Sequence, residues 1–351
     1  MLYTVYFFFF FVIAIYVTLN YKRAVGLGLT FVVCAAFAIW AGFRDFTWAD
    51  TIGYSMVFEY ETPTIFSFFS TPQTPLYAES GFFFLSSVIR TIADDHVVYF
   101  FIIAALSLYF LGDGISKYGR LPLLALCVYI ARFMFGRHFM QIRGGLAIAI
   151  LFWGIQYFTQ KDWRKSAVII LIAYMLHRSA LLAVPMFFMN YLPLKKWHVV
   201  VGIVLSMLVV VTMPGIIEAN VQEATEDVNV EHYADTSGND FKQEKGLGLR
   251  NPMIYYQIAI LFAFTFAEER LKKLTAHYYT LRNGYLFSTV LLIVLSGYRI
   301  LSARTSTVFA TYEILMVPLL IYICNTKNRY WGYLGILLIY TAIFYMNMKL
   351  V

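Results

Sequence analysis

Long apolar runs alternate with short polar connections along almost the whole chain. They lack the every-second-residue alternation of a transmembrane strand, and most approach the ~20 residues that a helix needs to cross a bilayer. The pattern therefore predicts an all-α polytopic membrane protein with about twelve transmembrane helices. The runs, bounded by charged residues, Gly or Pro, lie near residues 3–19, 25–43, 97–112, 121–136, 142–160, 164–177, 179–191, 197–213, 251–267, 281–298, 305–324 and 329–347.

The apolar stretch 81–93 has only 13 residues and contains Arg90. It is short for a crossing, so we expect a helix that lies at the membrane interface. This choice also places the loop with Lys117 on the same side as the loop with Lys22, as the positive-inside rule requires. The first run follows no basic segment and precedes no small-residue cleavage site, so we expect it to remain as a helix.

Composition excludes a soluble enzyme with a single membrane anchor. Of the 351 residues, 60% are hydrophobic and 13% are charged, and the mean hydropathy is +0.68. The net charge of +7 is distributed among short loops, so it forms no basic patch of the kind that binds nucleic acid. Residues 1–351 show no internal repeat and no soluble domain boundary, which predicts a single transmembrane domain.

The two sides of the predicted topology differ in their basic residues. With both termini outside, the cytoplasmic loops hold nine Lys and six Arg, whereas nine of the remaining twelve basic residues are Arg. Lys in a short loop serves to retain that loop in the cytoplasm. The planar fork of Arg, in contrast, binds phosphate or carboxylate through two hydrogen bonds. The outer face is therefore expected to bind an anion.

Two outer segments are long enough to carry function. Residues 214–250 hold eight acids and little apolar periodicity, so this segment is expected to be a polar lid. Residues 44–96 are acidic and aromatic. There, Asp50 and Glu79 are able to deprotonate or orient a sugar hydroxyl, and Tyr54 is one of the rings that can stack on a sugar. The alternative is an ordinary acidic loop with interfacial aromatic residues.

Basic residues gather around a helix break that is expected at Gly136. Arg132 and Arg137 flank it, and three arginines at membrane depth are costly unless they are paired or face water. The third, Arg143, opens a Gly-rich helix whose exposed amides and dipole also favour an anion. The alternative is that these side chains only extend to the interface.

Two further clusters lie at predicted outer helix ends. His177 and Arg178 stand between two apolar runs, and beside the Arg a neutral His is expected, although such a His often only packs or caps a helix. Arg299 and Arg304 flank the connection before a helix that contains Tyr312 and Glu313. Because Glu313 lies in an apolar run, it needs a buried partner or a water-filled cavity, and one of these two arginines is the expected partner.

Four short motifs follow one another along roughly residues 1–310. They are Arg44-(five residues)-Asp50-Thr51-(two)-Tyr54, then Tyr77-x-Glu79-x-Gly81-Phe82 with Leu85, then Arg143 opening a Gly/Ala-rich helix, and finally His177-Arg178-Ser179-Ala180-Leu181-Leu182. In their order and spacing, these motifs resemble the EpsG group of Wzy-type polysaccharide polymerases. The sequence departs from the pattern at Gly144, where relatives often have Gln after the Arg.

The resemblance implies a glycosyltransferase with a GT-C-like arrangement in the bacterial inner membrane. It would join undecaprenyl-diphosphate-linked oligosaccharide repeat units, of the O-antigen, capsule or exopolysaccharide type, at the periplasmic face. Donor and acceptor would both be polyprenyl-diphosphate-linked, and a chain-length regulator protein is a further expected partner. Three alternatives remain: a lipid-linked oligosaccharide flippase, which should show internal repeats, an O-antigen ligase, and an acyltransferase with His177 as base.

The expected site residues follow from this chemistry, which needs cations for a departing diphosphate and a base for a hydroxyl. Asp50, then His177, then Glu79 are the candidates for the base. A salt bridge from Arg44 to Asp50 and helix capping by Glu79 are the structural alternatives. No cofactor and no metal are expected, because the acids of 44–96 form no compact ligand cluster. The residues expected to bind diphosphate and sugar are Arg44, Arg137, Arg143, Arg178, Arg299, Arg304, Tyr54 and Tyr312.

Overall fold

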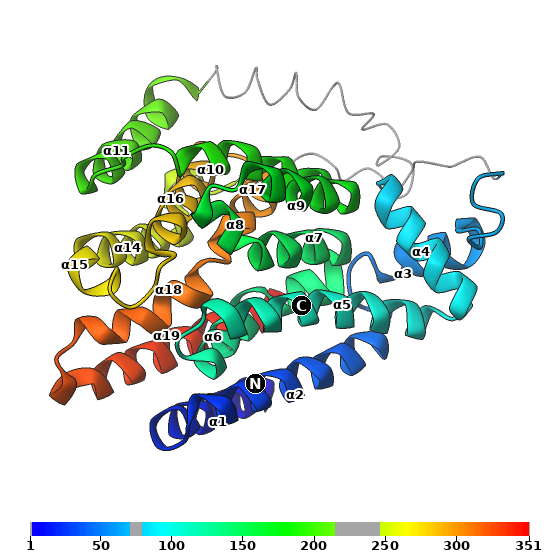
Figure 1. Cartoon of the computed structure of the whole chain (residues 1–351), viewed down its shortest axis with the longest axis horizontal. Helices are drawn as coiled ribbons and strands as arrows, with labels where there is room; N and C mark the ends of the chain where they lie inside the picture. Colours follow the sequence, from blue (N-terminus) through cyan, green and yellow to red (C-terminus); the bar gives the residue numbers. More distant parts are fainter. Residues whose placement is uncertain (1, 71–78, 215–245, 351) are drawn as a thin grey trace.

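The computed structural model describes residues 2–70, 79–214 and 246–350. Most of the predicted lid 214–250 and Tyr77 of the second motif lie outside these residues. Within them the chain is helical and forms no β-strand, as the apolar pattern predicts. The helices cluster into a bundle whose longer members run roughly along its longest axis (Figure 1).

The first half of the described chain carries the outer segment 44–96 and the elements that surround the candidate site. Three of these elements, η1, η2 and η3, are π-helical turns, and η4 is a 3₁₀ turn. The elements are α1 (Leu2–Asn20), α2 (Arg23–Gly42), α3 (Thr51–Met56), η1 (Val57–Glu61), α4 (Ser80–Ile92), α5 (His96–Tyr118), α6 (Pro122–Tyr129), η2 (Ile130–Met134), η3 (Gly136–Met140), α7 (Ile142–Trp153), α8 (Ile155–Gln160), α9 (Trp163–Leu176), η4 (Arg178–Leu182), α10 (Ala183–Met189) and α11 (Lys196–Thr212).

The second half contains a strongly bent helix pair. Helices α17 and α18 meet at an angle of 60°, and Pro318 lies inside α18. The elements are η5 (Gly248–Arg250), α14 (Pro252–Phe266), α15 (Glu268–Leu271), α16 (Tyr278–Val294), α17 (Arg299–Ala310), α18 (Glu313–Leu320), η6 (Ile321–Ile323), η7 (Thr326–Asn328) and α19 (Arg329–Leu350).

Several helices of the described chain are long and apolar enough to cross a membrane. By length and composition there are four, or five if the bent pair α17 and α18 counts as one span. The protein is therefore a polytopic membrane protein, whereas the number twelve stays a prediction. Breaks inside the apolar runs account for the difference: the run 142–160, for example, is divided at Gly154 into α7 and α8.

Two predicted boundaries were tested directly. The short run 81–93 is indeed a separate helix, α4, and it lies steeply across the end of the bundle near α5 (Figure 1). The break expected at Gly136 is wrong, because the backbone stays helical through Met140 as π turns and leaves the helix only at Gln141. A π turn accommodates an extra residue within a helix that continues. The presence of Gly136 is therefore not enough to predict the end of the helix.

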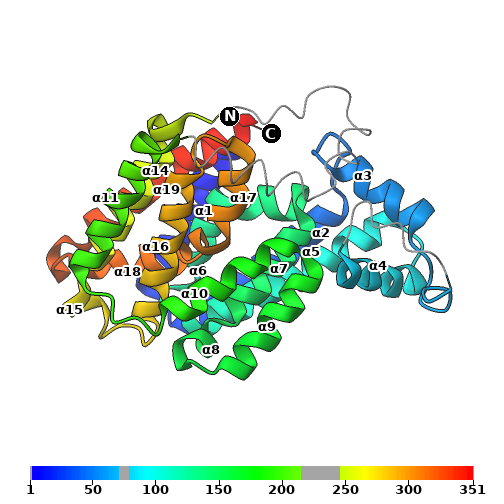
Figure 2. The same ribbon diagram turned by 90° about the horizontal axis from the view of Figure 1, so that it is seen from above.

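Helices α6, α7 and α18 form the centre of the bundle. Nearly all of their residues are buried, whereas α1 buries only 17% of its most apolar window. An apolar helix with an exposed surface is suited to lipid. The stacked rings of Phe7 and Phe344, 4.3 Å apart, place the start of α1 beside the end of α19, so the first and last helices of the described chain lie side by side (Figure 2).

Loops that the topology assigns to one side meet in the structure. Arg23 donates to the carbonyl oxygens of Ser116 and Gly119, and the guanidinium group of Arg120 lies 5.1 Å from the centre of the Tyr322 ring. The three connections at which these residues lie were predicted to be cytoplasmic. They lie at the end of the bundle opposite α3 and α4 (Figure 1), which agrees with the predicted separation of the two sets of loops.

Candidate functional site

An ion pair between Glu79 and Arg143 is the centre of the site. Glu79 directly precedes α4, and Arg143 lies in the first turn of α7. An Arg143 nitrogen lies 2.8 Å from Oε2 of Glu79, and both side chains are largely buried, with 13% and 14% of their surface exposed. Arg143 Nε also donates to the Tyr54 hydroxyl at 3.2 Å. Three motifs that are far apart in the sequence therefore meet at one guanidinium group.

Close backbone contacts at two glycines bring these elements together. A Cβ at Gly81 would lie 2.6 Å from the Cβ of Met175, so α4 approaches α9 as only a glycine allows. A Cβ at Gly145 would lie 2.5 Å from the carbonyl oxygen of Arg137, which presses the start of α7 against η3. The two contacts fix the positions of Glu79 and Arg143.

The segment from His177 to Ser179 bonds to the free carboxylate oxygen of the Glu79–Arg143 ion pair. Helix α9 ends at Leu176, and His177 has an extended backbone before the 3₁₀ turn η4. The backbone N–H of Arg178 donates to Oε1 of Glu79 at 3.1 Å, so both carboxylate oxygens of Glu79 are bonded. Glu79 is the first residue before α4, but its side chain makes no capping bond to that helix. Its side chain instead ties α7 to η4.

His177 is a neutral hydrogen-bonding group. Its Nδ1 accepts from the backbone N–H of Ser179 at 3.2 Å and lies 2.7 Å from the Ser179 hydroxyl oxygen. An acceptor at Nδ1 assigns the proton of the neutral ring to Nε2. The Nε2 atom faces Gly144, whose Cβ would lie 3.8 Å from it. His177 therefore presents an N–H donor on the Gly144 side of the ring.

Burial is the main reason that the pKa of His177 falls to about 4. The negative charge of Glu79 opposes this shift, whereas the guanidinium groups of Arg143 and Arg304 add to it. An imidazole with an ordinary pKa near 6.5 titrates close to neutrality. In the folded protein His177 stays neutral at neutral pH. The sequence predicts this state from the neighbouring Arg178, whereas in the structure it follows mainly from burial.

We expect this shift to appear in the pH dependence of stability. Between the unfolded pKa near 6.5 and the folded pKa of about 4, only the unfolded chain takes up the His177 proton, so stability falls as the pH is lowered. The loss should approach about 2 kcal/mol at pH 5. Apparent unfolding temperatures at pH 7 and pH 5 should therefore diverge more for the wild type than for His177→Gln. Equal differences for both proteins would contradict the assigned state.

Arg304 adds a further positive charge. Helix α17 packs against η4, and the Arg304 side chain is exposed there. Arg178 is exposed as well. Within the described ranges neither guanidinium group has an ion-pair partner. Arg143 pairs with Glu79, whereas Arg178 bonds to Glu79 only through its backbone N–H. Because Arg178 and Arg304 lack a carboxylate partner among the residues that the structure describes, the site carries an excess of positive charge. Arg299, at the start of α17, is also exposed.

Three residues that were expected to bind substrate lie elsewhere. Arg44 is buried, donates to the carbonyl oxygens of Ala41 and Phe139, and lies 3.7 Å from the centre of the Phe100 ring. It forms no salt bridge with Asp50, so that structural alternative is wrong. Arg137 is buried too. Tyr312 is buried at the bend between α17 and α18, and its ring would clash with a Cβ at Gly284.

Arg137 binds protein groups in place of an external anion. It donates to the Thr307 carbonyl oxygen at 2.7 Å and to the Thr311 hydroxyl at 2.6 Å. Its guanidinium group also lies 4.3 Å from the centre of the Phe133 ring. The contacts attach η3 to α17, the helix that carries Arg304. The structure therefore does not bring Arg137 to the Glu79 ion pair.

Asp50 lies next to the site without joining the ion pair. It has a left-handed backbone with φ 63° directly before α3, a conformation that Asp adopts more readily than most residues. Its carbonyl oxygen accepts the backbone N–H of Tyr54 at 3.0 Å, so the two residues lie one helical turn apart. The Asp50 carboxylate is exposed and has no polar partner in the part of the chain that the structure describes.

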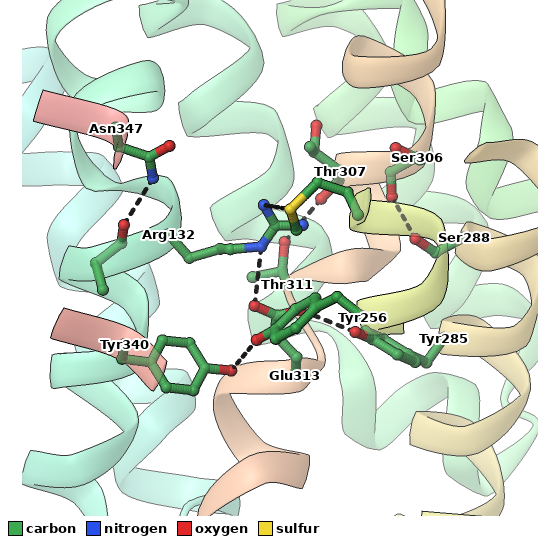
Figure 3. A network of polar contacts seen from close by, with 12 residues as sticks. Arg132, Tyr256, Tyr285, Ser288, Ser306, Thr307, Thr311, Glu313, Tyr340 and Asn347 are labelled. Atoms are coloured by element: carbon green, nitrogen blue, oxygen red, sulfur yellow. Dashed lines mark hydrogen bonds and ion pairs between the residues drawn. The ribbon is translucent and has the colours of Figure 1, made fainter. Parts of the chain in front are cut away.

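A second charged pair is buried inside the bundle (Figure 3). Arg132 Nε donates to Glu313 Oε1 at 3.1 Å, and the exposed fractions of the two side chains are 12% and 0%. The Tyr285 hydroxyl donates to the other oxygen of Glu313 at 2.9 Å. The partner of Glu313 is therefore Arg132, and the expectation of an arginine from the 299–304 connection is wrong. Helix α6 packs directly on α18, which explains the choice.

Sequence reasoning missed the tyrosines that surround this pair. Tyr256 and Tyr340, from α14 and α19, bond to one another through their hydroxyl groups beside Glu313 (Figure 3). The chain has 27 tyrosines, most of them in apolar runs, so composition alone could not single these out. These tyrosines are distinguished by their proximity to the buried Glu313. They come from different helices, so this proximity appears only once the packing of the helices is known.

These features define a class: a polytopic α-helical membrane protein with a positively charged polar site where several helices end. In the described residues no three His, Cys, Asp or Glu side chains form a metal-ligand cluster. The chain belongs to the EpsG family, because the model of that family matches residues 27–351. The match includes every residue of the site. No curated protein and no solved structure matches the chain. Family membership indicates a function of the polysaccharide-polymerase type.

Proposed function

We propose that this protein is a Wzy-type polymerase that joins undecaprenyl-diphosphate-linked oligosaccharide repeat units. The products would be O-antigen-like or related surface polysaccharides. The observation that carries the proposal is the excess of arginines over carboxylates in the site. Arg143 pairs with Glu79, and Arg178 and Arg304 have exposed side chains on the neighbouring elements η4 and α17. A diphosphate is the anion that such a set of arginines suits best.

The proposed reaction transfers the growing chain to the next repeat unit. A hydroxyl oxygen of the lipid-linked acceptor sugar forms a bond to the anomeric carbon of the donor. The bond from that carbon to the diphosphate oxygen breaks, and the lipid diphosphate leaves with the electron pair. The hydroxyl proton passes to a base or to water. Charge therefore develops on the leaving oxygen, where positioned donors lower the barrier most.

Each residue of the site has a role in this reaction. Arg143, oriented by Glu79 and Tyr54, would bind the diphosphate together with the exposed Arg178 and Arg304. The Nε2–H of His177 is suited to donate a hydrogen bond to the leaving diphosphate. The exposed Asp50 carboxylate is the candidate acceptor for the hydroxyl proton. Glu79, with both oxygens bonded, would orient the cations.

The same proposal includes the membrane arrangement. We propose a GT-C-like organisation with about twelve spans, in which shorter helices such as α7 and α10 combine with their neighbours. The site would face the periplasm of a bacterial inner membrane, with both termini on that side. The Lys-rich connections at the opposite end support this orientation through the positive-inside rule. A chain-length regulator is a proposed partner.

Purified full-length protein incubated with a lipid-diphosphate-linked repeat unit tests the function. We expect a ladder of products on a gel, and one polyprenyl diphosphate released for each new glycosidic bond. Transfer to a lipid A-core acceptor without a ladder would identify a ligase. Movement of the unit across a proteoliposome bilayer without a new bond would identify a flippase. Either result would overturn the proposal.

A further inference from the structure

An apolar groove runs along the outside of α9 and α10. Its volume is about 650 Å³. Several of its walls are exposed aromatic or branched side chains, which is the surface that a helix presents to lipid. The lining residues from α9 are Trp163, Ser166, Ala167, Ile170, Leu171 and Tyr174, and those from the returning segment are Leu181, Val184, Phe187, Phe188 and Tyr191.

The groove ends at the site. From Trp163 to Tyr174 it follows ~16 Å of α9, at 1.5 Å per residue, and α9 ends only two residues after Tyr174. The segment that turns back towards α10 is His177 followed by the 3₁₀ turn η4. The groove therefore leads along the bundle to the segment that bonds to Glu79.

A cation stands at the outer mouth of the groove. Residues three apart lie on the same side of a 3₁₀ turn, so Arg178 shares a side with Leu181, which lines the groove. The Arg178 side chain is exposed, whereas its backbone N–H is held by Glu79 at 3.1 Å. The mouth thus combines an apolar channel with an exposed arginine whose backbone N–H bonds to Glu79.

We propose that this groove binds the polyprenyl chain of the lipid-linked donor, whose diphosphate lies at Arg178. The inference rests on the proposed function for the identity of the lipid. An amphiphile with a long apolar tail and a doubly charged head matches both parts of this surface. Its tail would lie in the apolar groove, and its head would contact the arginines. The tail would then set the position of the reactive sugar.

Photolabelling tests this inference without requiring turnover. A polyprenyl diphosphate that carries a diazirine in its tail is irradiated with the full-length protein in nanodiscs. We expect labelled peptides from α9 and α10, and competition by unlabelled polyprenyl diphosphate. Competition to the same degree by an ordinary phospholipid would overturn the proposal, because the groove would then hold bulk lipid.

Matched variants on one helix sharpen the test. Ala167→Trp fills the groove, whereas Val168→Trp places the same ring on a neighbouring exposed position outside the lining. We expect Ala167→Trp to reduce labelling about tenfold, which corresponds to the loss of about two buried methylene groups of the tail. We expect Val168→Trp to be labelled as the wild type is. Leu171→Trp and Ile172→Trp form a second pair if Ala167→Trp does not fold. Equal labelling within a folded pair would overturn the proposal.

Activity separates this inference from the proposed function. If the groove positions the tail, Ala167→Trp should raise the KM for a long-chain donor much more than the KM for a short-tailed donor, and Val168→Trp should raise neither. A wild-type protein that joins neither donor would refute the polymerase function. The labelling result would still decide whether the groove binds a polyprenyl diphosphate.

Discussion

Arg143→Lys is expected to impair polymer formation nearly as much as Arg143→Ala, by about 100-fold or more. Removing one positioned donor from a low-dielectric site costs about 2.7–4 kcal/mol of transition-state stabilisation. Arg143 contacts Glu79 and Tyr54 through two different nitrogens, whereas an ammonium group cannot reproduce this fork. The measurement is the initial rate of ladder formation, together with donor binding in the same preparation.

Two further variants show whether the ion pair acts as a unit. Glu79→Gln should reduce the rate, and adding it to Arg143→Ala should cause little further loss, because residues of one network are not additive. Arg164→Ala is the matched control, since Arg164 is an exposed arginine at the opposite end of α9. A wild-type rate for Arg143→Lys would show that bidentate recognition is not needed.

Glu313→Gln is expected to destabilise the protein by about 3–5 kcal/mol, the usual cost of leaving one buried charge without its partner. The amide still accepts a hydrogen bond from Tyr285, so the main change is the loss of the charge that Arg132 faces. Arg132→Met should be similarly harmful. The combined variant should recover most of the loss, because neither charge remains buried. Apparent unfolding temperatures in detergent and yields from membranes measure the effect.

An exposed ion pair gives the control for this prediction. Glu269 and Lys272 lie 2.8 Å apart, and 72% of the Glu269 side chain is exposed. Exposed pairs contribute about 0–1 kcal/mol, so Glu269→Gln should change stability little. If Glu313→Gln is equally mild, Glu313 carries no charge that requires Arg132, and the buried network is held by hydrogen bonds alone.

The apolar pattern predicted most helices but not how they are interrupted. The runs 3–19 and 25–43 became α1 and α2 with nearly the expected bounds. The run 305–324 was expected as one span, but it bends by 60° at Thr311 and Tyr312. Hydrophobicity measures the free energy of transferring side chains from water into lipid, and it contains no information on the direction of the backbone. The pattern of apolar residues therefore does not indicate a bend between two buried helices.

The candidate site was predictable in part. The structure gathers Tyr54, Glu79, Arg143 and the His177–Arg178 segment, all of which the motifs indicated. Arg44 was chosen on the same grounds but donates to backbone carbonyl oxygens. A sequence shows that a buried guanidinium group needs acceptors, but it does not show whether these are a ligand, a carboxylate or the ends of helices.

The buried pair of Arg132 and Glu313 also bears on how the chain is assembled. The two residues are 181 positions apart, and a charged residue at the centre of an isolated helix disfavours insertion by about 2.5–3.5 kcal/mol. At ~5–20 residues per second, ~10–40 s of synthesis separate them. During this interval Arg132 lacks its partner Glu313, so its segment must be shielded from lipid by other helices or by the insertion machinery. Final closure of the bundle is therefore a late event of biogenesis, and nascent chains that stop before α18 would be exposed to membrane proteases.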